Sequence, residues 1–312
     1  MKIPLGVSSC LLGEKVRFDG GHKQHHYITD QLSCYFQFIS VCPEVECGLS
    51  VPREAMHLVG NPLEPRLVTI KSGRDLTEQM RQWCHRRIQE LGLLQLRGFI
   101  FKKNSPSSGL FRVKVYQRNG PPLTTGSGLF AKALTVTYPL LPAEEEGRLA
   151  DTKLRENFIE RVFCYDRLLT FLANRPSKAD LVRFHTEHKL LLMAHSPDHY
   201  RRLGKLVADT VPLKEQLAAY SSLFMEGLQL LATPAKQTNV MMHCLGYFKK
   251  QLESWEKHEL LDLIERHRNG QLPLIVPLTL LKHYIRRFDQ SYLAEQLYFR
   301  PHPDELMLRN HA

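Results

Sequence analysis

The chain has 312 residues, of which 43% are hydrophobic and 24% are charged, as in globular proteins of one large or two ordinary domains. Its formal net charge of +10 favours an anionic partner, nucleic acid first, although a merely basic enzyme has the same balance. The most apolar late stretch, 272–281, is too short to span a bilayer and includes two prolines. Residues 1–5 lack a signal-peptide core, and seven scattered cysteines do not suggest a disulfide framework. We therefore expect a cytoplasmic protein without a membrane segment.

The first half of the chain alternates short apolar runs with helical and Gly/Pro-rich segments. Five runs have the pattern of β-strands: 3–7, 36–41, 67–70, 98–101 and 112–116. Residues 76–94 carry apolar side chains at close to helical spacing, and Asp75 is a candidate cap for that helix. The alternation predicts an α/β N-terminal domain, a mostly parallel sheet with flanking helices.

The pattern changes at residues 139–150, where two prolines, an acidic run and a glycine suggest a connector. Beyond it nearly every segment has helical periodicity, including 158–172, 181–195, 220–231, 240–267 and 278–288. We predict an α/β domain over 1–138, a connector over 139–150 and an all-α C-terminal domain over 151–312.

Three of the predicted strands are followed by loops with reactive side chains. Cys10 follows the first strand, Cys42 the second, and the serines of 105–109 follow 98–101. Because loops at the carboxyl ends of parallel strands share one crevice, these groups should meet there. A cysteine in such a loop is a nucleophile, a metal ligand or a small buried residue, and the matched placement of two favours a site. The other cysteines, except Cys47, fit a buried core: Cys34, Cys84, Cys164 and Cys244.

The chain resembles the thiouracil desulfidase family over about residues 1–138. The motifs that carry this resemblance are GVSSCLLG at 6–13, VRFDGGHK at 16–23, VCPE at 41–44, GRDLT at 73–77, SPSSG at 105–109 and GSGLFA at 126–131. The second half resembles the helical domain often fused to that domain, through KLRENF at 153–158, FHTEHKLLLMAHS at 184–196, GYFKK at 246–250 and PHPDELMLRN at 301–310. Together the halves are similar to the tRNA 4-thiouridine desulfidases.

The resemblance implies a [4Fe-4S] cluster held by three cysteines, one from each loop, with one iron left open to bind the thiocarbonyl sulfur. It also implies that Glu44 handles protons and that Ser105 positions the water or the pyrimidine. The cluster ligands would be Cys10, Cys42 and the residue at 108, where the family pattern Ser-Pro-Ser-Cys-Gly has cysteine and this chain has Ser108. A serine hydroxyl is a poorer iron ligand than a thiolate. Ser108 therefore marks an introduced ligand replacement, a homologue in which Cys47 is the third ligand, or one that no longer desulfurates.

Polar and basic residues near the loops and in the second half are candidate substrate or RNA contacts. They are Arg17, Asp19, Lys23, Lys102, Lys103, Ser107, Lys189, Arg201 and Arg202. Phe18 and Tyr27 are candidates for stacking on a base. His185, His188, His195 and His199 lack the accompanying glutamate of a zinc motif. We expect them to share a polar surface with Lys189, Arg201 and Arg202, which either faces phosphate or is simply a solvated helix surface.

We therefore expect a [4Fe-4S]-dependent, C–S bond-cleaving enzyme that converts 4-thiouridine in tRNA to uridine, with thiolated tRNA rather than DNA as its partner. The helical half would hold the tRNA while the first domain takes the base, since displacing a stacked base costs a few kcal/mol. One alternative is a desulfidase for free thiouracil. Another is a non-catalytic tRNA-binding protein, which Ser108 favours.

Overall fold

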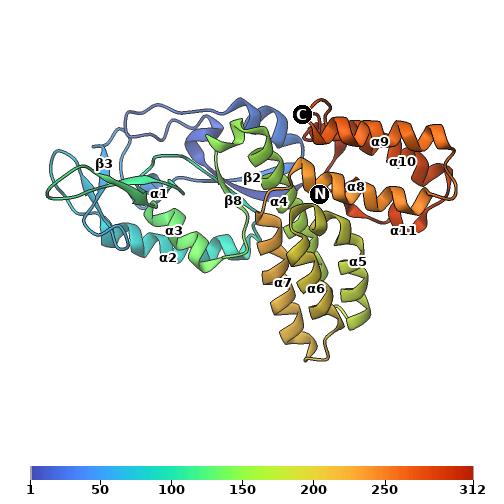
Figure 1. Ribbon diagram of the computed structural model, residues 1–312. Coiled ribbons are helices and arrows are strands. Elements are labelled where there is room, and N and C mark those ends of the chain that lie inside the picture. The colour runs from blue at the N-terminus through green and yellow to red at the C-terminus, as the bar shows by residue number, and fades with distance from the viewer. Residues whose placement is uncertain (1, 312) are drawn as a thin grey trace. The chain divides into compact units, whose positions relative to one another are not determined.

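The computed structural model describes residues 2–311, which form two compact units divided between Asp151 and Thr152 (Figure 1). The first unit contains all the strands, and the second consists of helices with short connections. The predicted fold class, an α/β domain followed by an all-α domain, is confirmed.

The central sheet of the first unit has four parallel strands in the order β2-β1-β5-β8. They span Ile3–Ser8 (β1), Phe36–Val41 (β2), Phe99–Phe101 (β5) and Ala143–Glu145 (β8). Leu5, Val7 and all three residues of β5 are buried, as expected for a sheet covered on both faces. The three strands predicted to precede the loops therefore lie side by side, so their loops emerge at one edge.

The segment predicted as a connector, 139–150, instead belongs to the first unit. Its strand β8 pairs with β5, and its acidic run Glu144–Glu146 is buried. Glu145 accepts hydrogen bonds from the backbone N–H groups of Leu110 and Phe111 (2.8 and 3.1 Å), and Glu146 accepts one from Lys103 (2.7 Å). A run of acidic residues usually indicates a solvent-exposed segment. Here Glu145 and Glu146 are buried because they accept hydrogen bonds from backbone N–H groups of the third loop.

A second four-stranded sheet, which the sequence did not indicate, lies in the same unit. Its strands are β3 (Met56–Val59), β4 (Arg66–Thr69), β6 (Val113–Tyr116) and β7 (Leu123–Gly126), in the order β4-β3-β6-β7 with mixed directions. The predicted strands at 67–70 and 112–116 thus exist but belong to this sheet. Buried and exposed side chains alternate along β6, the pattern of a sheet with one solvated face.

Two helices of the first unit, α2 (Thr77–Leu93) and α3 (Leu129–Thr137), lie side by side (Figure 1). The Trp83 ring of α2 packs against Phe130 of α3, with centroids 5.3 Å apart. Asp75 accepts a 2.9 Å hydrogen bond from the Thr77 backbone N–H, but the N-cap residue of α2 is Leu76, so Asp75 lies one residue before the cap and the predicted cap was wrong by one position. The shorter helical segments of this unit are η1 (Ser9–Leu12), η2 (Tyr27–Gln31), η3 (Leu32–Cys34), α1 (Pro43–Glu46) and η4 (Arg148–Ala150).

The second unit is built from α4 (Thr152–Ala173), α5 (Lys178–His195), α6 (Pro197–Ala208), α7 (Leu213–Gln229), α8 (Pro234–Phe248), α9 (Ser254–Arg268), α10 (Ile275–Arg287), α11 (Ser291–Ala294), η5 (Leu297–Phe299) and η6 (Asp304–Leu306). The expectation of one helix over 240–267 was wrong. The helix ends at Phe248, and a new helix, α9, begins at Ser254, where Glu253 and Glu256 form a capping box. Across residues 2–311, no helix has the length and apolar character that a membrane span requires.

Candidate functional site

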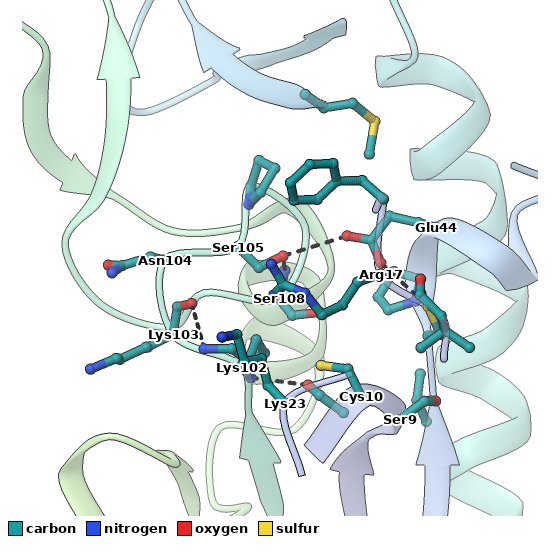
Figure 2. Close-up of a pocket in the computed structure, with 18 of the residues that line it drawn as sticks. Ser9, Cys10, Arg17, Lys23, Glu44, Lys102, Lys103, Asn104, Ser105 and Ser108 are labelled. Carbon is teal, nitrogen blue, oxygen red and sulfur yellow. Dashed lines mark hydrogen bonds between the residues drawn. The ribbon is translucent and has the colours of Figure 1, made fainter. Parts of the chain in front are cut away.

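The loops after β1, β2 and β5 enclose a pocket of about 370 Å³ in the first unit (Figure 2). Cys10 lies in η1 directly after β1, Cys42 follows β2, and Ser105 and Ser108 lie in the loop after β5. The volume is in the range of small-molecule sites. The convergence predicted from three separate sequence segments is thus present in the fold.

The two pocket thiols are largely buried. Burial raises the pKa of Cys10 to about 11, and burial together with the nearby Glu44 carboxylate raises that of Cys42 to about 12. Both thiols are therefore protonated at neutral pH in the protein by itself. A bound metal cation would displace the protons, because the thiolate is the form that ligates.

The third loop presents Ser108 rather than a thiol to the same pocket. The Ser108 backbone N–H donates to the Ser105 hydroxyl (3.1 Å), and Asn104 adopts the left-handed backbone region with φ of 59°. Gly128, at the start of α3, lies so close to this loop that a Cβ there would be 2.4 Å from the carbonyl carbon of Ser107. A glycine is required at 128 for the loop to lie where it does.

Glu44, the second residue of α1, extends into the pocket (Figure 2). Its Oε1 accepts a 2.5 Å hydrogen bond from the Ser107 hydroxyl and lies 3.5 Å from that of Ser105. The Cys42 Sγ lies 3.5 Å from Oε2 of the same carboxylate. Ser107, predicted as a substrate contact, is fully buried behind Glu44, so it positions the carboxylate and is out of reach of RNA.

Basic side chains line the rest of the pocket: Arg17, Lys23, Arg53, Lys102 and Lys103. Among the described residues Glu44 is the one carboxylate in that lining. Phe18 also lines the pocket and is 42% exposed, whereas Tyr27 lies outside it. Asp19 does not line it either; it pairs with Arg17 (3.4 Å) and accepts from the Gly21 N–H, which orders the turn that carries Arg17. The balance of charge suits an anionic ligand.

Arg53 and Glu146 are the site residues that the sequence analysis missed. The Arg53 guanidinium donates to the Val16 carbonyl (2.9 Å) and lies 3.8 Å from Glu44 Oε2, so it connects the first and second loops. Glu146 forms an ion pair with Lys102 at the pocket wall. Neither lies in one of the three loop motifs recognised in the sequence, and Glu146 reaches the site only because β8, which it follows, pairs with β5.

The remaining candidate residues lie elsewhere. Lys189 is on α5, and Arg201 and Arg202 are exposed on α6, all in the second unit. The prediction that the histidines form an exposed polar surface was wrong, because His185 and His188 are buried. Burial lowers the pKa of His185 to about 4 and that of His188 to about 3. They are neutral core residues rather than phosphate contacts.

The other cysteines separate into buried and accessible groups. Cys84, Cys164 and Cys244 are buried as expected, but Cys34 is exposed because it ends a short surface helix, η3. Cys47 does not line the pocket; its Sγ lies 3.2 Å from the Glu44 backbone oxygen.

Two of the three side chains that would hold an iron–sulfur cluster in this pocket have the sulfur donor that such a cluster prefers. Two thiols and the Ser108 hydroxyl line it at the positions of the three expected ligands, and Cys47 offers no third sulfur there. Sulfur is the preferred donor to such clusters, and a hydroxyl is hard and mostly protonated. The residues therefore fit the group with two sulfur ligands and one oxygen.

Fold and site together define a protein with a thiol-containing, cationic pocket at the carboxyl edge of a parallel sheet, joined to a helical domain. The chain belongs to the 2-thiouracil desulfurase family, whose model matches residues 5–146, and residues 189–303 match a second family described as a protein of unknown function (DUF1722). The resemblance seen in the sequence is thus confirmed.

Two curated relatives are similar over nearly their whole length. The uncharacterized protein YbgA of Escherichia coli (strain K12) is 33% identical over 48% of this chain and 90% of its own. The uncharacterized protein YbbK of Bacillus subtilis (strain 168) is 31% identical over 41% of this chain and 87% of its own. A solved structure described as the [4Fe-4S]-dependent thiouracil desulfidase TudS is 27% identical, with a TM-score of 0.40 over 48% of this chain and 95% of that one.

Proposed function

We propose that this chain removes sulfur from 4-thiouridine in tRNA and leaves uridine. The observation that carries the proposal is the pocket itself, where two thiols and one carboxylate lie within a ring of five basic side chains. The family match supports C–S bond cleavage on a thiolated pyrimidine. The basic lining and the overall charge of +10 favour a polyanionic substrate over a free, uncharged base.

The reaction exchanges the thiocarbonyl sulfur for the oxygen of water, with no net oxidation, and sulfur leaves as sulfide. A [4Fe-4S] cluster held by Cys10, Cys42 and Ser108 would supply a Lewis acid that draws electron density from the thiocarbonyl carbon. The Glu44 carboxylate is oriented by Ser107 and Arg53 and takes the proton of the attacking water. Ser105 lines the pocket beside Glu44 and holds the water or the pyrimidine by its hydroxyl.

The substrate's remaining parts have matching groups around the pocket. Arg17, Lys23 and Lys103 meet the phosphates that flank the base, and the exposed part of the Phe18 ring stacks on it. In the second unit, Arg201 and Arg202 with Lys189 contact the tRNA backbone. These contacts offset the cost of taking the base out of its stack.

The test is turnover of three substrates by anaerobically reconstituted protein: thiolated tRNA, free 4-thiouracil and free 2-thiouracil. Loss of the thiocarbonyl absorbance from tRNA alone, or much faster than from the free bases, supports the proposal. Turnover of only the free bases makes the chain a thiobase desulfidase. Binding of tRNA without turnover, in this chain and in its Ser108→Cys variant, makes it a non-catalytic RNA-binding protein.

The Ser108→Cys variant tests the third ligand. Because sulfur binds iron more tightly than a hydroxyl does, we expect Ser108→Cys to raise cluster retention on the order of 10–100-fold, with a parallel gain in turnover. Iron and sulfide counts after gel filtration measure it, with Cys34→Ser as the control for an exposed cysteine outside the pocket. Equal iron counts in both proteins would show that Ser108 is an adequate ligand.

A further inference from the structure

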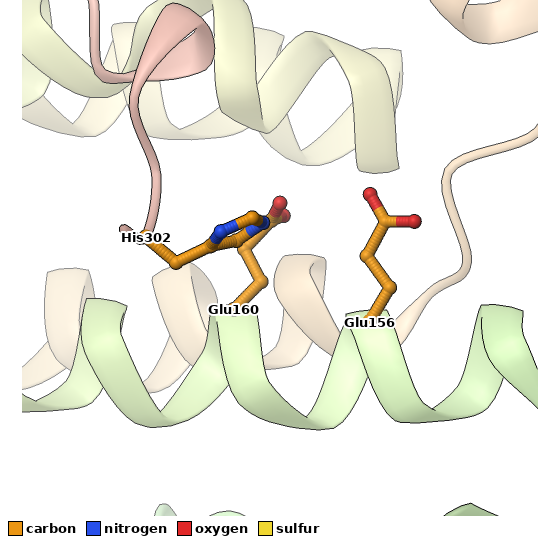
Figure 3. Close-up of side chains that lie close together, drawn as sticks. All are labelled: Glu156, Glu160 and His302. Atoms are coloured by element: carbon orange, nitrogen blue, oxygen red, sulfur yellow. The ribbon is translucent and has the colours of Figure 1, made fainter. Parts of the chain in front are cut away.

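Three side chains of the second unit form a compact group of their own (Figure 3). Glu156 and Glu160 lie on α4, four residues apart and hence on one helix face, and His302 comes from the C-terminal segment after η5. One carboxylate oxygen of each glutamate and one ring nitrogen of His302 all lie within 4.8 Å of one another. None of the three residues lines the desulfidase pocket.

The hydrogen bonding of His302 leaves its Nε2 atom available to bind a metal ion. Its ring is 5% exposed, and Nδ1 lies 3.1 Å from the Pro303 carbonyl oxygen, which only accepts, so Nδ1 carries the hydrogen. The neutral ring then has its lone pair on Nε2, a buried atom with no hydrogen-bond partner within the described residues. A backbone carbonyl that fixes one ring nitrogen while the other is available is the usual support of a metal-bound histidine.

The two carboxylates retain capacity for a further cation. Arg309 reaches both, but loosely, with Nε 3.6 Å from Glu156 Oε1 and Nη2 3.4 Å from Glu160 Oε2. Charge-assisted hydrogen bonds of this kind are normally 2.7–2.9 Å long. Arg309 is held more firmly by the Tyr298 carbonyl oxygen, at 2.6 Å from Nη1. His195 contacts Glu160 and His311 lies 3.2 Å from Glu156, yet each carboxylate oxygen has two lone pairs.

We propose that Glu156, Glu160 and His302 form a binding site for a divalent transition-metal ion that accepts nitrogen and oxygen ligands, of which zinc is the representative. Imidazole nitrogen and carboxylate oxygen are both zinc ligands, and three protein ligands leave a fourth position for water. Of the described residues within this group, only His302 lies outside α4. The ion therefore ties the C-terminal segment to α4 and stabilises the helical domain.

The experiment titrates zinc chloride into the full-length chain by calorimetry after chelator dialysis. Cys10→Ser and Cys42→Ser are introduced first, so that the pocket thiols do not take the metal. We expect one zinc per chain and a higher melting temperature with zinc. His302→Ala should lower the affinity on the order of 10–100-fold, and His302→Cys, which restores a ligand, should recover it.

His258→Ala is the matched control, because His258 is an exposed histidine on α9 in the same domain. Glu156→Gln is a second test that avoids the more deeply buried Glu160, and it should also weaken binding while the circular dichroism spectrum stays unchanged. Zinc binding that is absent from the parent protein, or equal in the parent, His302→Ala and Glu156→Gln proteins, would overturn the proposal.

Discussion

Burial gives the two pocket thiols a different reactivity from the exposed Cys34. A raised pKa means less thiolate at any given pH, and thiolate is the reactive form. We predict that, in cluster-free protein at pH 8, iodoacetamide modifies Cys34 well before Cys10. Below the Cys10 pKa of about 11, its rate should rise about tenfold per pH unit.

Mass spectrometry of peptides after timed alkylation measures both rates. A Cys10 rate that levels off near neutral pH would mean that the thiol is already ionised, and the argument from burial would then fail. Reconstitution with iron should protect Cys10 and Cys42 but leave the Cys34 rate unchanged.

Glu44 is the residue on which proton transfer depends. Its carboxylate is held by Ser107 and Arg53, so Glu44→Gln preserves the size and the hydrogen-bond acceptor but removes the base. We predict a fall in kcat on the order of 10²–10⁴-fold with tRNA affinity little changed. Single-turnover kinetics and filter binding separate the two effects.

Glu64→Gln is the control, because it removes one negative charge from an exposed loop outside the pocket. If Glu44→Gln retains the parent kcat, the carboxylate carries no proton in the reaction. If Glu64→Gln loses activity as well, the effect is one of net charge.

At the scale of elements, the third loop owes its position to the start of α3. Gly128 N–H donates to the Gly109 carbonyl (2.7 Å) and Phe130 N–H to that of Ser107 (2.9 Å), so the loop and the helix share hydrogen bonds. This contact fixes Ser105 and Ser108 relative to Cys10, because the loop cannot shift without breaking it. The geometry of the site thus depends on Gly128, which does not itself line the pocket.

We predict that Gly128→Ala destabilises the first unit by about 1–3 kcal/mol and lowers cluster retention, because the added Cβ meets the backbone of Ser107. Urea unfolding followed by Trp83 fluorescence in a Trp255→Phe background reports on that unit, because the chain's other tryptophan, Trp255, lies on α9 of the second unit. Gly246→Ala in α8 is the control, since no atom lies within 4 Å of its added Cβ, and it should stabilise its helix by about 0.5–1 kcal/mol. Equal effects of the two substitutions would contradict the packing argument.

Both units of the chain carry part of its positive charge. Residues 1–150 have 19 lysines and arginines against 13 acidic residues, and the rest of the chain has 23 against 19. A tRNA has many phosphates, so a tRNA whose base enters the pocket of the first unit can also contact basic residues of the second. If the second unit binds tRNA and the first carries out the reaction, mutations in the second unit should weaken tRNA binding without changing the chemistry in the pocket.

We predict that the double variant Arg201→Glu with Arg202→Glu weakens tRNA binding on the order of tenfold or more, while turnover of any free thiobase is unchanged. Added salt should weaken parent binding and have a smaller effect on the variant. The pair Arg266→Glu and Arg268→Glu on α9 changes the net charge equally and is the control. The same loss in both double variants would mean that net charge, rather than the α6 surface, binds tRNA.

The first parallel strands and the convergence of their loops could be predicted from the sequence, since the signals lie within a few residues. A short apolar run followed by Cys10, or by Cys42-Pro43-Glu44, needs no distant information to be recognised. The second sheet could not be predicted in this way, because β3 and β6 are more than 50 residues apart and their pairing depends on the folded chain. The same holds for β8, whose acidic residues are buried only because the third loop offers them backbone donors.

Local sequence patterns thus establish which loops carry the thiols, the carboxylate and the serines, and that a helical domain follows. Three further features depend on the folded chain: Arg53 lines the pocket while Glu146 pairs with Lys102 of its wall, Ser107 lies behind Glu44, and His185 and His188 are core residues. It also brought His302 to Glu156 and Glu160 across more than 140 residues of chain. The physical reason is that local patterns depend on backbone periodicity and turn chemistry, whereas burial and charge pairing depend on which distant segments pack together.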